Sequence, residues 1–500
     1  MKLKKIVALL MVFAMMSVAF VGCSKAGDDK TKGNTGSETS TETTTGDGQN
    51  TASNGEVVTL KWIMVGNGMP TNYEAWLANI NPYLAEKIGV NIDVEVVPWS
   101  DWDTRRSVIV NSGENFDILF TDGGKYTSEV SLGAFADITD IVKNSASDLY
   151  SYIPADYWDA VSVNGKIYSV PTYKDSSSTQ YFVWDKAIAD KYKVDYEKEN
   201  PTLASLTDTF KAMKEGEGTT PVITDKAGFE VVTSVYDQMG AGLVPLGVRY
   251  DDQSRKVVNV LEQEDILSQL DTVHQWYKDG IINADAPAVG EAPSYRMFYI
   301  AQGWSSAAKT TWGPNMGVEA VAQKFIDTIV SNNTVRGSLN GVSASSKYPE
   351  KCLQFLQLLN LDSKVRDAFY YGLEGENFNY NANNEIEKIN NDWTMAGYTQ
   401  GTFFTVSKLA DDEINQWDEV KELNANANPS VLLGFNLDTS KIETELANCR
   451  SVYEKYKSEL MTGAKEPREL VKAISAELDA AGFQTIVKEA QSQIDAYAQQ

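Results

Sequence analysis

Hydrophobic positions in the N-terminal half of the chain recur in short runs that are typical of β-strands. Residues 57–65, VVTLKWIMV, are largely apolar, and residues 90–97 alternate β-branched with polar side chains before they end in two valines. Residues 116–120, FDILF, form a short apolar run bounded by polar residues. These patterns predict three strands, the third of them buried on both faces of a sheet.

Helices are predicted between these strands. One covers residues 72–88, and a second begins after Ser100 and stops at Gly113. Ser100 is an acceptable N-cap, and Asp101 and Asp103 place negative charge in the first turn, where the helix dipole stabilises it. Strand, crossover helix and strand in one short unit predict parallel strands with a right-handed connection.

The ends of these strands are the first candidate for a binding site, because ligands of open α/β sheets collect beyond the carboxyl ends of parallel strands. Residues 98–100 include Trp99, which offers an indole face, and residues 121–124 include Asp122, a carboxylate next to free backbone amides. Asn67 follows the first strand, so Asn67 and Asp122 are predicted to reach one ligand from the same edge. For each of these two residues, an ordinary role in a turn is the alternative.

The first 22 residues have the pattern of a secretory signal, with three lysines before an apolar run and a small residue at its end. Residues 20–23, FVGC, also resemble the lipobox of bacterial lipoproteins, which predicts lipidation of Cys23. A plain signal peptide cut near Ser24 is the alternative. The segment through residue 56 is almost entirely small and polar, so it cannot bury enough apolar surface to offset its ordering entropy. We expect a tether over residues 23–56 that holds the protein on the extracytoplasmic side of the cell membrane.

Composition narrows the class of protein. About 440 residues follow the tether, which is too long for one core and suits two or more domains. The net charge of −25 repels nucleic acid and anionic lipid head groups, so neither is an expected partner. Cys352 and Cys449 lie on apolar stripes of predicted helices, and two buried thiols are favoured over a disulfide.

Catalytic and cofactor patterns are weak. The sequence GNGMPT after the first strand lacks the third glycine of a dinucleotide fingerprint. The one histidine, His274, lies beside an apolar helix stripe, which favours a packing role over a catalytic base. With one histidine and two internal cysteines, a His/Cys metal cluster is not expected. A pair of carboxylates could hydrolyse glycosides, but no spacing singles one out. We expect no cofactor, metal or catalytic residue.

Motifs along the rest of the chain carry a family resemblance. Asn164 and Gly165 predict a hairpin turn inside VNGKIYSVPTY. The order NSGENFDILF, GAFADITDIV and VNGKIYSVPTY…YFVWDK resembles the N-terminal half of extracellular solute-binding proteins of the maltose-binding-protein superfamily. FYIAQGWSSA matches a place where that superfamily often has a sugar-stacking tryptophan. YYGLEGENFNY and the last hundred residues resemble the LplA-like lipoprotein subgroup and its C-terminal domain of unknown function.

The resemblance implies a two-lobed, periplasmic-binding-protein-like (clamshell) α/β fold, with mostly parallel sheets flanked by helices and extra C-terminal helices. The first lobe would hold residues 57–172 and 328–361, and the second residues 173–323. The C-terminal helical region, residues 362–500, would pack on the lobes or the hinge. Residues 170–173 would be the first crossing between the lobes.

The function that the resemblance implies is capture of a solute between the lobes and its delivery to the permease subunits of an ABC importer, by a monomer anchored through its lipid. Aromatic residues at strand ends and in loops favour an oligosaccharide, since sugars need flat apolar faces and planar polar groups. A peptide or another polar solute is the first alternative, and a secreted glycan-active enzyme or adhesin the second. The candidate ligand-binding residues are Asn67, Trp99, Trp102, Asp122, Tyr173, Trp304, Trp312, Glu374 and Trp393. For each tryptophan the alternative is packing, and for Glu374 it is a solvated turn; at Trp304 the motif and the chemistry agree.

Overall fold

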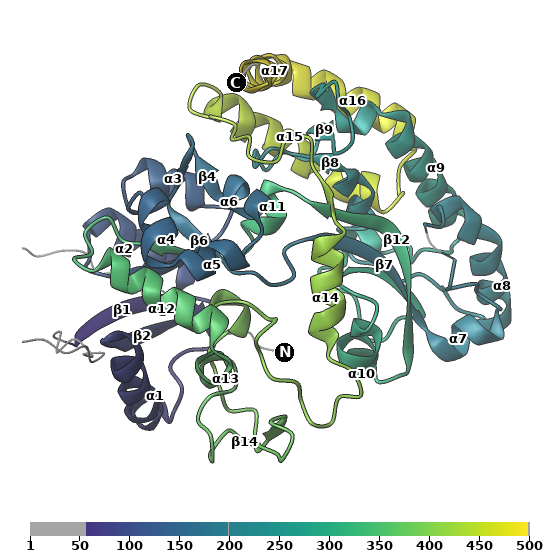
Figure 1. Ribbon diagram of the computed structural model, residues 1–500. Helices are drawn as coiled ribbons and strands as arrows, with labels where there is room; N and C mark the ends of the chain where they lie inside the picture. Colours follow the sequence, from purple (N-terminus) through teal and green to yellow (C-terminus); the bar gives the residue numbers. More distant parts are fainter. Residues whose placement is uncertain (1–56, 199, 499–500) are drawn as a thin grey trace, which may run out of the picture. The chain divides into compact units, whose positions relative to one another are not determined.

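The computed structural model describes residues 57–198 and 200–498 (Figure 1). Residues 55–500 form one compact unit. The predicted signal segment, the lipidation site at Cys23 and the tether lie outside the described residues. The described chain is built around two sheets, each with a hydrophobic core of its own.

The first sheet contains the three predicted strands. Its strand order is β2-β1-β3-β13-β6. The strands are β1 (Val58–Gly66), β2 (Val90–Pro98), β3 (Ile118–Thr121), β6 (Ser169–Pro171) and β13 (Leu339–Val342). β1 runs parallel to both β2 and β3, so the predicted parallel unit is confirmed, whereas β13 is antiparallel to its neighbours β3 and β6. The alternation in β2 places its valines and Ile92 inside and its polar residues toward solvent.

Helices of the first lobe cover this sheet in Figure 1. The first lobe contains α1 (Tyr73–Ile88), α2 (Trp102–Ser112), α3 (Tyr126–Ser131), α4 (Thr139–Ser145), α5 (Ser147–Tyr152), α6 (Ala155–Val161), α12 (Pro349–Leu361) and α13 (Ser363–Tyr371). The predicted N-cap at Ser100 is wrong. The backbone N–H of Asp101 donates to the carbonyl oxygen of Pro98 in a turn before the helix, and Asp101 takes the N-cap position of α2. Gly113 ends α2 as predicted, in the left-handed conformation with φ 68°.

The second sheet has the order β11-β7-β12-β16. Its strands are β7 (Ser178–Asp185), β11 (Phe298–Gln302), β12 (Ala320–Val330) and β16 (Asn428–Pro429). β7 is antiparallel to both β11 and β12, so the expectation of mostly parallel strands holds for β1–β3 but not here. The physical reason is topological: β7 carries the chain into this lobe, and β12 carries it out in the opposite direction.

Smaller elements complete the second lobe. A three-stranded sheet consists of β8 (Tyr236–Asp237), β9 (Leu246–Arg249) and β10 (Val258–Asn259). The helices around the two sheets are α7 (Lys186–Lys191), α8 (Thr207–Glu217), α9 (Glu264–Lys278) and α10 (Gly313–Met316). Two hairpins lie outside the second lobe: β4–β5 (Ser162–Val163 and Lys166–Ile167) packs in the first core, and β14–β15 (Phe378–Tyr380 and Ile386–Lys388) packs in a smaller separate cluster. The first has the predicted turn, with φ of 53° at Asn164 and 74° at Gly165.

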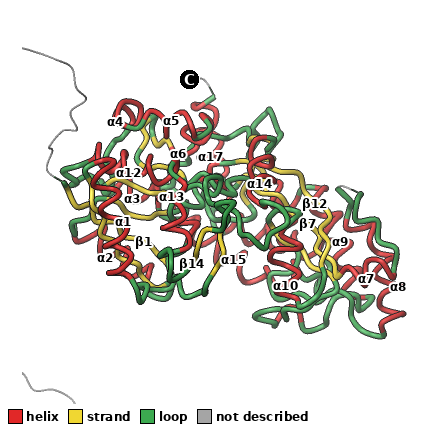
Figure 2. Tube along the Cα trace, turned by 60° about the horizontal axis from the view of Figure 1, so that its bottom comes forward, coloured by secondary structure: helices red, strands yellow, loops and turns green. Residues whose placement is uncertain are grey.

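The chain crosses from the first sheet to the second between β6 and β7, and returns between β12 and β13 through the short helix α11 (Asn332–Val335). Gln323, where the sequence places the end of the second lobe, lies inside β12. Figure 2 shows the strands of each sheet surrounded by helices, with loops between the two groups. The two crossing segments are thus the connection between β6 and β7 and the connection through α11.

The C-terminal helical region contributes to both cores. α13 packs in the first core, whereas α15 (Glu443–Met461), α16 (Pro467–Ala480) and α17 (Phe483–Tyr497) pack in the second. α14 (Gln416–Ala425) lies against β12. Cys352 is buried in the first core and Cys449 in the second, and both are free, which confirms two structural thiols.

Candidate functional site

A pocket of about 680 Å³ lies where the two crossing segments meet both lobes. The turn after β3 contributes Gly123 and Gly124, the first crossing contributes Lys174 and Asp175, and the second crossing contributes residues near α11. Residues of β7, β8 and β11 form the wall from the second lobe. The pocket therefore touches the carboxyl end of β3, the edge at which the sequence predicted a site.

The carboxylate of Asp122 is held in place at this edge by Arg106 of α2. The Arg106 side chain is only 3% exposed, and it donates to Asp122 (Nη1 to Oδ2, 2.8 Å) and to Glu129 (Nε to Oε1, 2.5 Å). Burial disfavours the guanidinium charge, but the bonds and charges of Glu129 and Asp122 outweigh it and raise the pKa of Arg106. Asp122 Oδ1 also accepts from the backbone N–H of Gly124 at 2.9 Å. The result is a half-buried carboxylate with a fixed orientation beside the pocket.

An aromatic pair stands next to this carboxylate. The rings of Trp99 and Tyr398 are stacked, with centroids 6.0 Å apart and planes 12° from parallel. Lys174 Nζ lies 5.7 Å from the centroid of the Tyr398 ring. Burial, then the negative charges of Asp122 and Asp175, raise the pKa of Tyr398 to about 12. Tyr398 therefore joins the indole face, the lysine and both carboxylates into one polar and aromatic cluster.

The loop that carries Tyr398 is anchored by Arg366, which is fully buried. Its guanidinium donates to the carbonyl oxygens of Thr402 (2.6 Å) and Gly397 (2.8 Å) and to Oε1 of Gln400 (2.7 Å). A buried cation with this many acceptors fixes the loop on both sides of Tyr398. No short motif in the sequence indicates this role, because the contacts of Arg366 are set by the tertiary fold.

The second lobe contributes Asp237 to the pocket wall. Its carboxylate accepts from the hydroxyl of Ser430 (2.6 Å) and from the backbone N–H of Met239 (2.8 Å), and burial raises the pKa of Asp237. The residue lies on a two-residue strand, too short for a periodicity signal, so the sequence did not single it out.

Trp304 follows β11 and is half-buried on the second lobe. Its Nε1 donates to Oε1 of Gln416 at 3.2 Å, and its ring centroid lies 5.7 Å from that of Trp417. The next two residues, both serines, donate backbone and side-chain hydrogen bonds to Glu419. The Trp304 loop is thus fixed to α14, with part of the indole left accessible.

Three of the other aromatic candidates make packing contacts. Trp102 is 5% exposed and packs on Phe120, and Tyr173 is 6% exposed with its ring 4.7 Å from that of Phe404. Trp312 is 8% exposed and packs against Tyr181. Trp102, Tyr173 and Trp312 are not among the described residues that line the pocket.

The remaining candidates also lie outside the pocket lining. Trp393 donates from Nε1 to the carbonyl of Phe369 at 2.9 Å, and Glu374 is exposed in the turn before β14. Asn67 follows β1, which pairs with β3 as predicted, and its backbone N–H donates to Thr394 O at 2.9 Å. Trp99, Asp122 and Trp304 are not in the pocket lining either; Trp99 and Asp122 lie around Tyr398 next to the lining residues Gly123 and Lys174, and Trp304 is a half-buried candidate on the second lobe.

Comparisons with known proteins find similar sequences over most of the chain. Residues 78–415 match the family model of the bacterial extracellular solute-binding proteins, and residues 431–499 match a domain of unknown function, DUF3502. A carbohydrate ABC transporter substrate-binding protein of Streptococcus pneumoniae is 28% identical over 473 residues, which cover 91% of this chain and 94% of that protein.

Solved structures show the same fold. The crystal structure of the N-glycan transport solute-binding protein NgtS from Streptococcus pneumoniae matches with a TM-score of 0.79 and 25% identity, over 88% of this chain and 98% of that one. An HMO-binding, ABC-transporter-associated solute-binding protein from Bifidobacterium longum infantis matches with a TM-score of 0.61 and 15% identity, over 89% and 99%.

Proposed function

The chain belongs to the bacterial extracellular solute-binding proteins, and we propose that it is the receptor of an ABC importer that captures an oligosaccharide between its lobes and releases it unchanged. The observation that carries this proposal is the pocket to which both lobes and both crossing segments contribute. A solute in such a pocket contacts both lobes only when they are close together. That differential contact shifts the open–closed equilibrium toward the closed form, which is the form that the permease recognises.

The chemistry beside the pocket supports a sugar as the solute. Trp99 leaves 47% of its surface accessible and is backed by Tyr398, so it offers a flat apolar face to a pyranose ring. Asp122 is an oriented acceptor for sugar hydroxyl groups, and Lys174, which lies over the Tyr398 ring and pairs with Asp175, is a donor in the pocket lining. The names of the carbohydrate-binding relatives point the same way. A peptide or another polar solute is the alternative receptor function.

The receptor is proposed to bind the solute without cleaving it. The Asp122 carboxylate is engaged by Arg106, and Asp237 is buried and bonded to Ser430, so both serve as acceptors. In the part of the chain that the structure describes, no group of three His, Cys, Asp or Glu side chains could hold a metal ion. The bonds that Asp122 and Asp237 already make are the observations that support binding of an unchanged solute.

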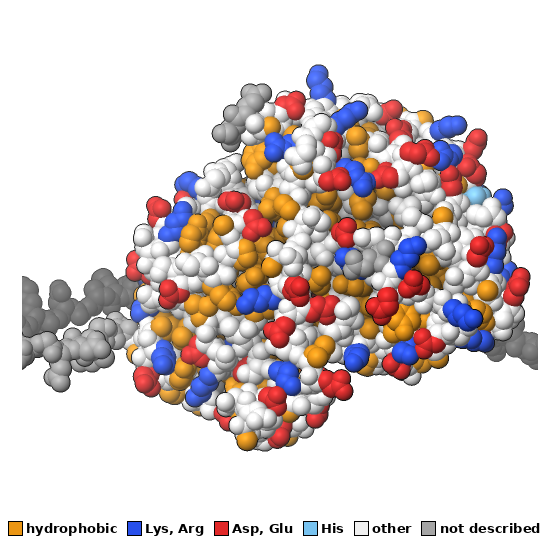
Figure 3. Space-filling view, turned by 45° about the vertical axis from the view of Figure 1, so that its right-hand side comes forward, with side chains coloured by type: hydrophobic (Ala, Val, Ile, Leu, Met, Phe, Trp, Pro, Cys, Tyr) orange, Lys and Arg blue, Asp and Glu red, His pale blue; other side chains and the backbone are white. Residues whose placement is uncertain are grey.

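We place the receptor on the extracytoplasmic side of the cell membrane, anchored by a lipid on Cys23. Among the described residues, no helix has the length and apolar character to cross a membrane. Acidic and basic side chains are interspersed on the face drawn in Figure 3, and no extended basic patch is visible on it. With the net charge of −25, this surface favours a neutral solute over nucleic acid as the partner.

A ligand screen tests the proposal. Residues 55–500, the compact unit that contains both cores, are heated with neutral oligosaccharides and, separately, with peptides. A bound oligosaccharide raises Tm as its concentration increases, because it binds the folded state by mass action. A screen in which only peptides raise Tm would replace the oligosaccharide by the alternative solute, and cleavage of a bound glycan would end the receptor function.

Variants of Trp304 test its place in the site. Trp304→Ala should weaken oligosaccharide binding by about 1–3 kcal/mol if the indole stacks on a sugar. Trp304→Phe is the control, because it keeps an aromatic face and removes the hydrogen bond to Gln416. Equal affinity of the Ala variant and the native protein would make Trp304 a packing residue.

A further inference from the structure

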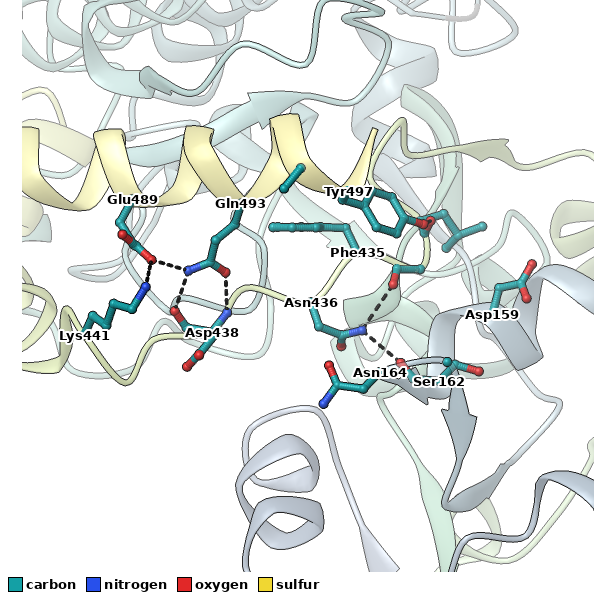
Figure 4. Close-up of a pocket in the computed structure, with 14 residues that line it drawn as sticks. Asp159, Ser162, Asn164, Phe435, Asn436, Asp438, Lys441, Glu489, Gln493 and Tyr497 are labelled. Atoms are coloured by element: carbon teal, nitrogen blue, oxygen red, sulfur yellow. Dashed lines mark hydrogen bonds and ion pairs between the residues drawn. The ribbon is translucent and has the colours of Figure 1, made fainter. Parts of the chain in front are cut away.

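A groove of about 800 Å³ separates the C-terminal domain, here residues 431–498, from the first lobe. Figure 4 shows its two walls, α17 with the segment that leads to Lys441 on one side and α6 with the β4–β5 hairpin on the other. The C-terminal domain has no function assigned to it by the family match.

Asn436 spans the base of this groove. Its Nδ2 donates to the carbonyl oxygen of Ser162 in the first lobe at 2.9 Å and to Gly434 O at 3.1 Å, and its Oδ1 accepts from Nη2 of Arg336 at 2.6 Å. The polar residues of the other wall bond among themselves, as Figure 4 shows for Asp438, Lys441, Glu489 and Gln493. Among the residues labelled in Figure 4, Asn436 is therefore the one whose side chain forms a hydrogen bond from one wall to the other.

Arg336 connects this contact to the interlobe pocket. It follows α11 in the second crossing and is buried, and its Nε donates to the carbonyl oxygen of Ala160 at 2.7 Å. Its own carbonyl oxygen accepts from the backbone N–H of Gly123 at 2.8 Å. Gly123 lines the interlobe pocket and directly follows Asp122. One residue thus bonds through its side chain to the C-terminal domain and through its backbone to the binding turn.

The position of the buried Arg336 side chain depends on the hydrogen bond that it donates to Asn436. Its hydrogen-bond acceptors, Ala160 O, Asn436 Oδ1 and, at the longer distance of 3.5 Å, Ser162 O, are all neutral, and burial lowers the pKa of Arg336 to about 10. Without Asn436, Nη2 keeps only the long bond to Ser162 O, and a poorly paired buried guanidinium is costly enough to shift the side chain and its backbone.

We propose that Asn436 is a positioning residue, through which the C-terminal domain holds Arg336 and thereby fixes the Gly123–Gly124 turn of the interlobe pocket. The inference deepens the proposed function, because it concerns the same pocket. Asn332 of α11 also bonds this domain, donating to the Phe435 carbonyl oxygen and accepting from the Gly434 N–H, so Asn436 is the contact that acts on Arg336 and Asn332 is a second contact with the same crossing. A preorganised turn lowers the cost of ordering the site when a solute binds.

Hydrogen–deuterium exchange of the ligand-free residues 55–500 tests this inference. In Asn436→Ala, the backbone amides of residues 121–126 should exchange about tenfold faster, because Gly123 loses the rigid support of Arg336. Gln493→Ala is the matched control. Gln493 also makes three hydrogen bonds at this groove, all of them within the C-terminal domain.

Asn436→Asp separates the two contacts of Asn436, since a carboxylate still accepts from Arg336 but cannot donate to Ser162. It should keep the exchange of residues 121–126 within about threefold of the native rate. Unchanged exchange in Asn436→Ala would overturn the inference, and so would an equal increase in Gln493→Ala, which would indicate general loosening. The exchange experiment uses no solute, so its result does not depend on whether the ligand screen finds one. Failure of the positioning role and failure of the proposed function are therefore distinguished.

Discussion

Replacing Trp99 by alanine removes the accessible indole face beside the interlobe pocket. One face of the ring is stacked on Tyr398, and 47% of the residue's surface is exposed. A tryptophan side chain buries about 200 Å² when it is fully covered, so roughly 100 Å² of Trp99 is available to a solute. If a sugar ring covers about half of that area, the transfer term is about 1 kcal/mol at 25 cal/mol per Å².

Loss of this contact should weaken oligosaccharide binding about fivefold to tenfold, since 1.4 kcal/mol corresponds to a factor of ten. Titration calorimetry of residues 55–500 measures the Kd for the glycan that gives the largest thermal shift. Trp99→Phe should lose less affinity, because it keeps a flat apolar face. Stability should fall by about 0.5–1.5 kcal/mol in Trp99→Ala through the lost stacking on Tyr398, which leaves the fold intact.

Tyr348→Ala provides a matched control. Tyr348 is 40% exposed and follows β13 at the end of the first sheet opposite the pocket. This variant should bind the glycan as the native protein does. A Kd for Trp99→Ala within twofold of the native value, or an equal loss in Tyr348→Ala, would refute the role of the indole face.

Two further predictions concern stability. The Tyr157 hydroxyl is buried without a hydrogen-bond partner among the described residues, whereas the Tyr126 hydroxyl donates to a carbonyl at 2.7 Å. In urea unfolding, Tyr157→Phe should be neutral or stabilising and Tyr126→Phe should cost about 1–2 kcal/mol; equal losses would contradict the unpaired hydroxyl. Hydrogen bonds from Arg105 lower the pKa of Glu114 to about 2, so this carboxylate stabilises the fold above its unfolded pKa of 4.5, and the contribution is lost as the pH falls toward 2. Glu114→Gln should therefore lower the free energy of unfolding by about 1 kcal/mol at pH 7, with a difference that shrinks toward pH 2; a constant difference would contradict the ion pair.

Local patterns in the sequence were enough to predict the three parallel strands of the first sheet, whereas the return strand β13 was expected only from the family resemblance. The strands β1, β2 and β3, the helix α1 and the hairpin at Asn164 follow from alternation, apolar runs and turn residues. The burial of both thiols follows from their helix stripes. The N-cap at Ser100 failed because the N-cap position of α2 lies one residue later, at Asp101, without any side-chain capping hydrogen bond, so the cap preference on which the prediction rested does not act here.

The rest of the site could not be predicted because its contacts join distant parts of the chain. Tyr398 meets Trp99 across about three hundred residues, and Arg336 meets Asn436 across a hundred. The antiparallel arrangement around β7 depends on the path of the chain through the lobe, which strand periodicity does not encode. Trp102 and Trp312 have the residue type of a sugar platform, and only the structure reveals that both are buried.

Native mass spectrometry of residues 55–500 with an oligosaccharide shows both whether the glycan binds and whether it stays intact. We expect one glycan bound per protein, with the mass of the intact glycan in the complex and in the solution after prolonged incubation. The bound fraction should fall in Trp99→Ala and remain in Tyr348→Ala. A glycan that is recovered cleaved, or one that binds the Trp99→Ala and native proteins equally, would contradict capture of an unchanged oligosaccharide in the interlobe pocket.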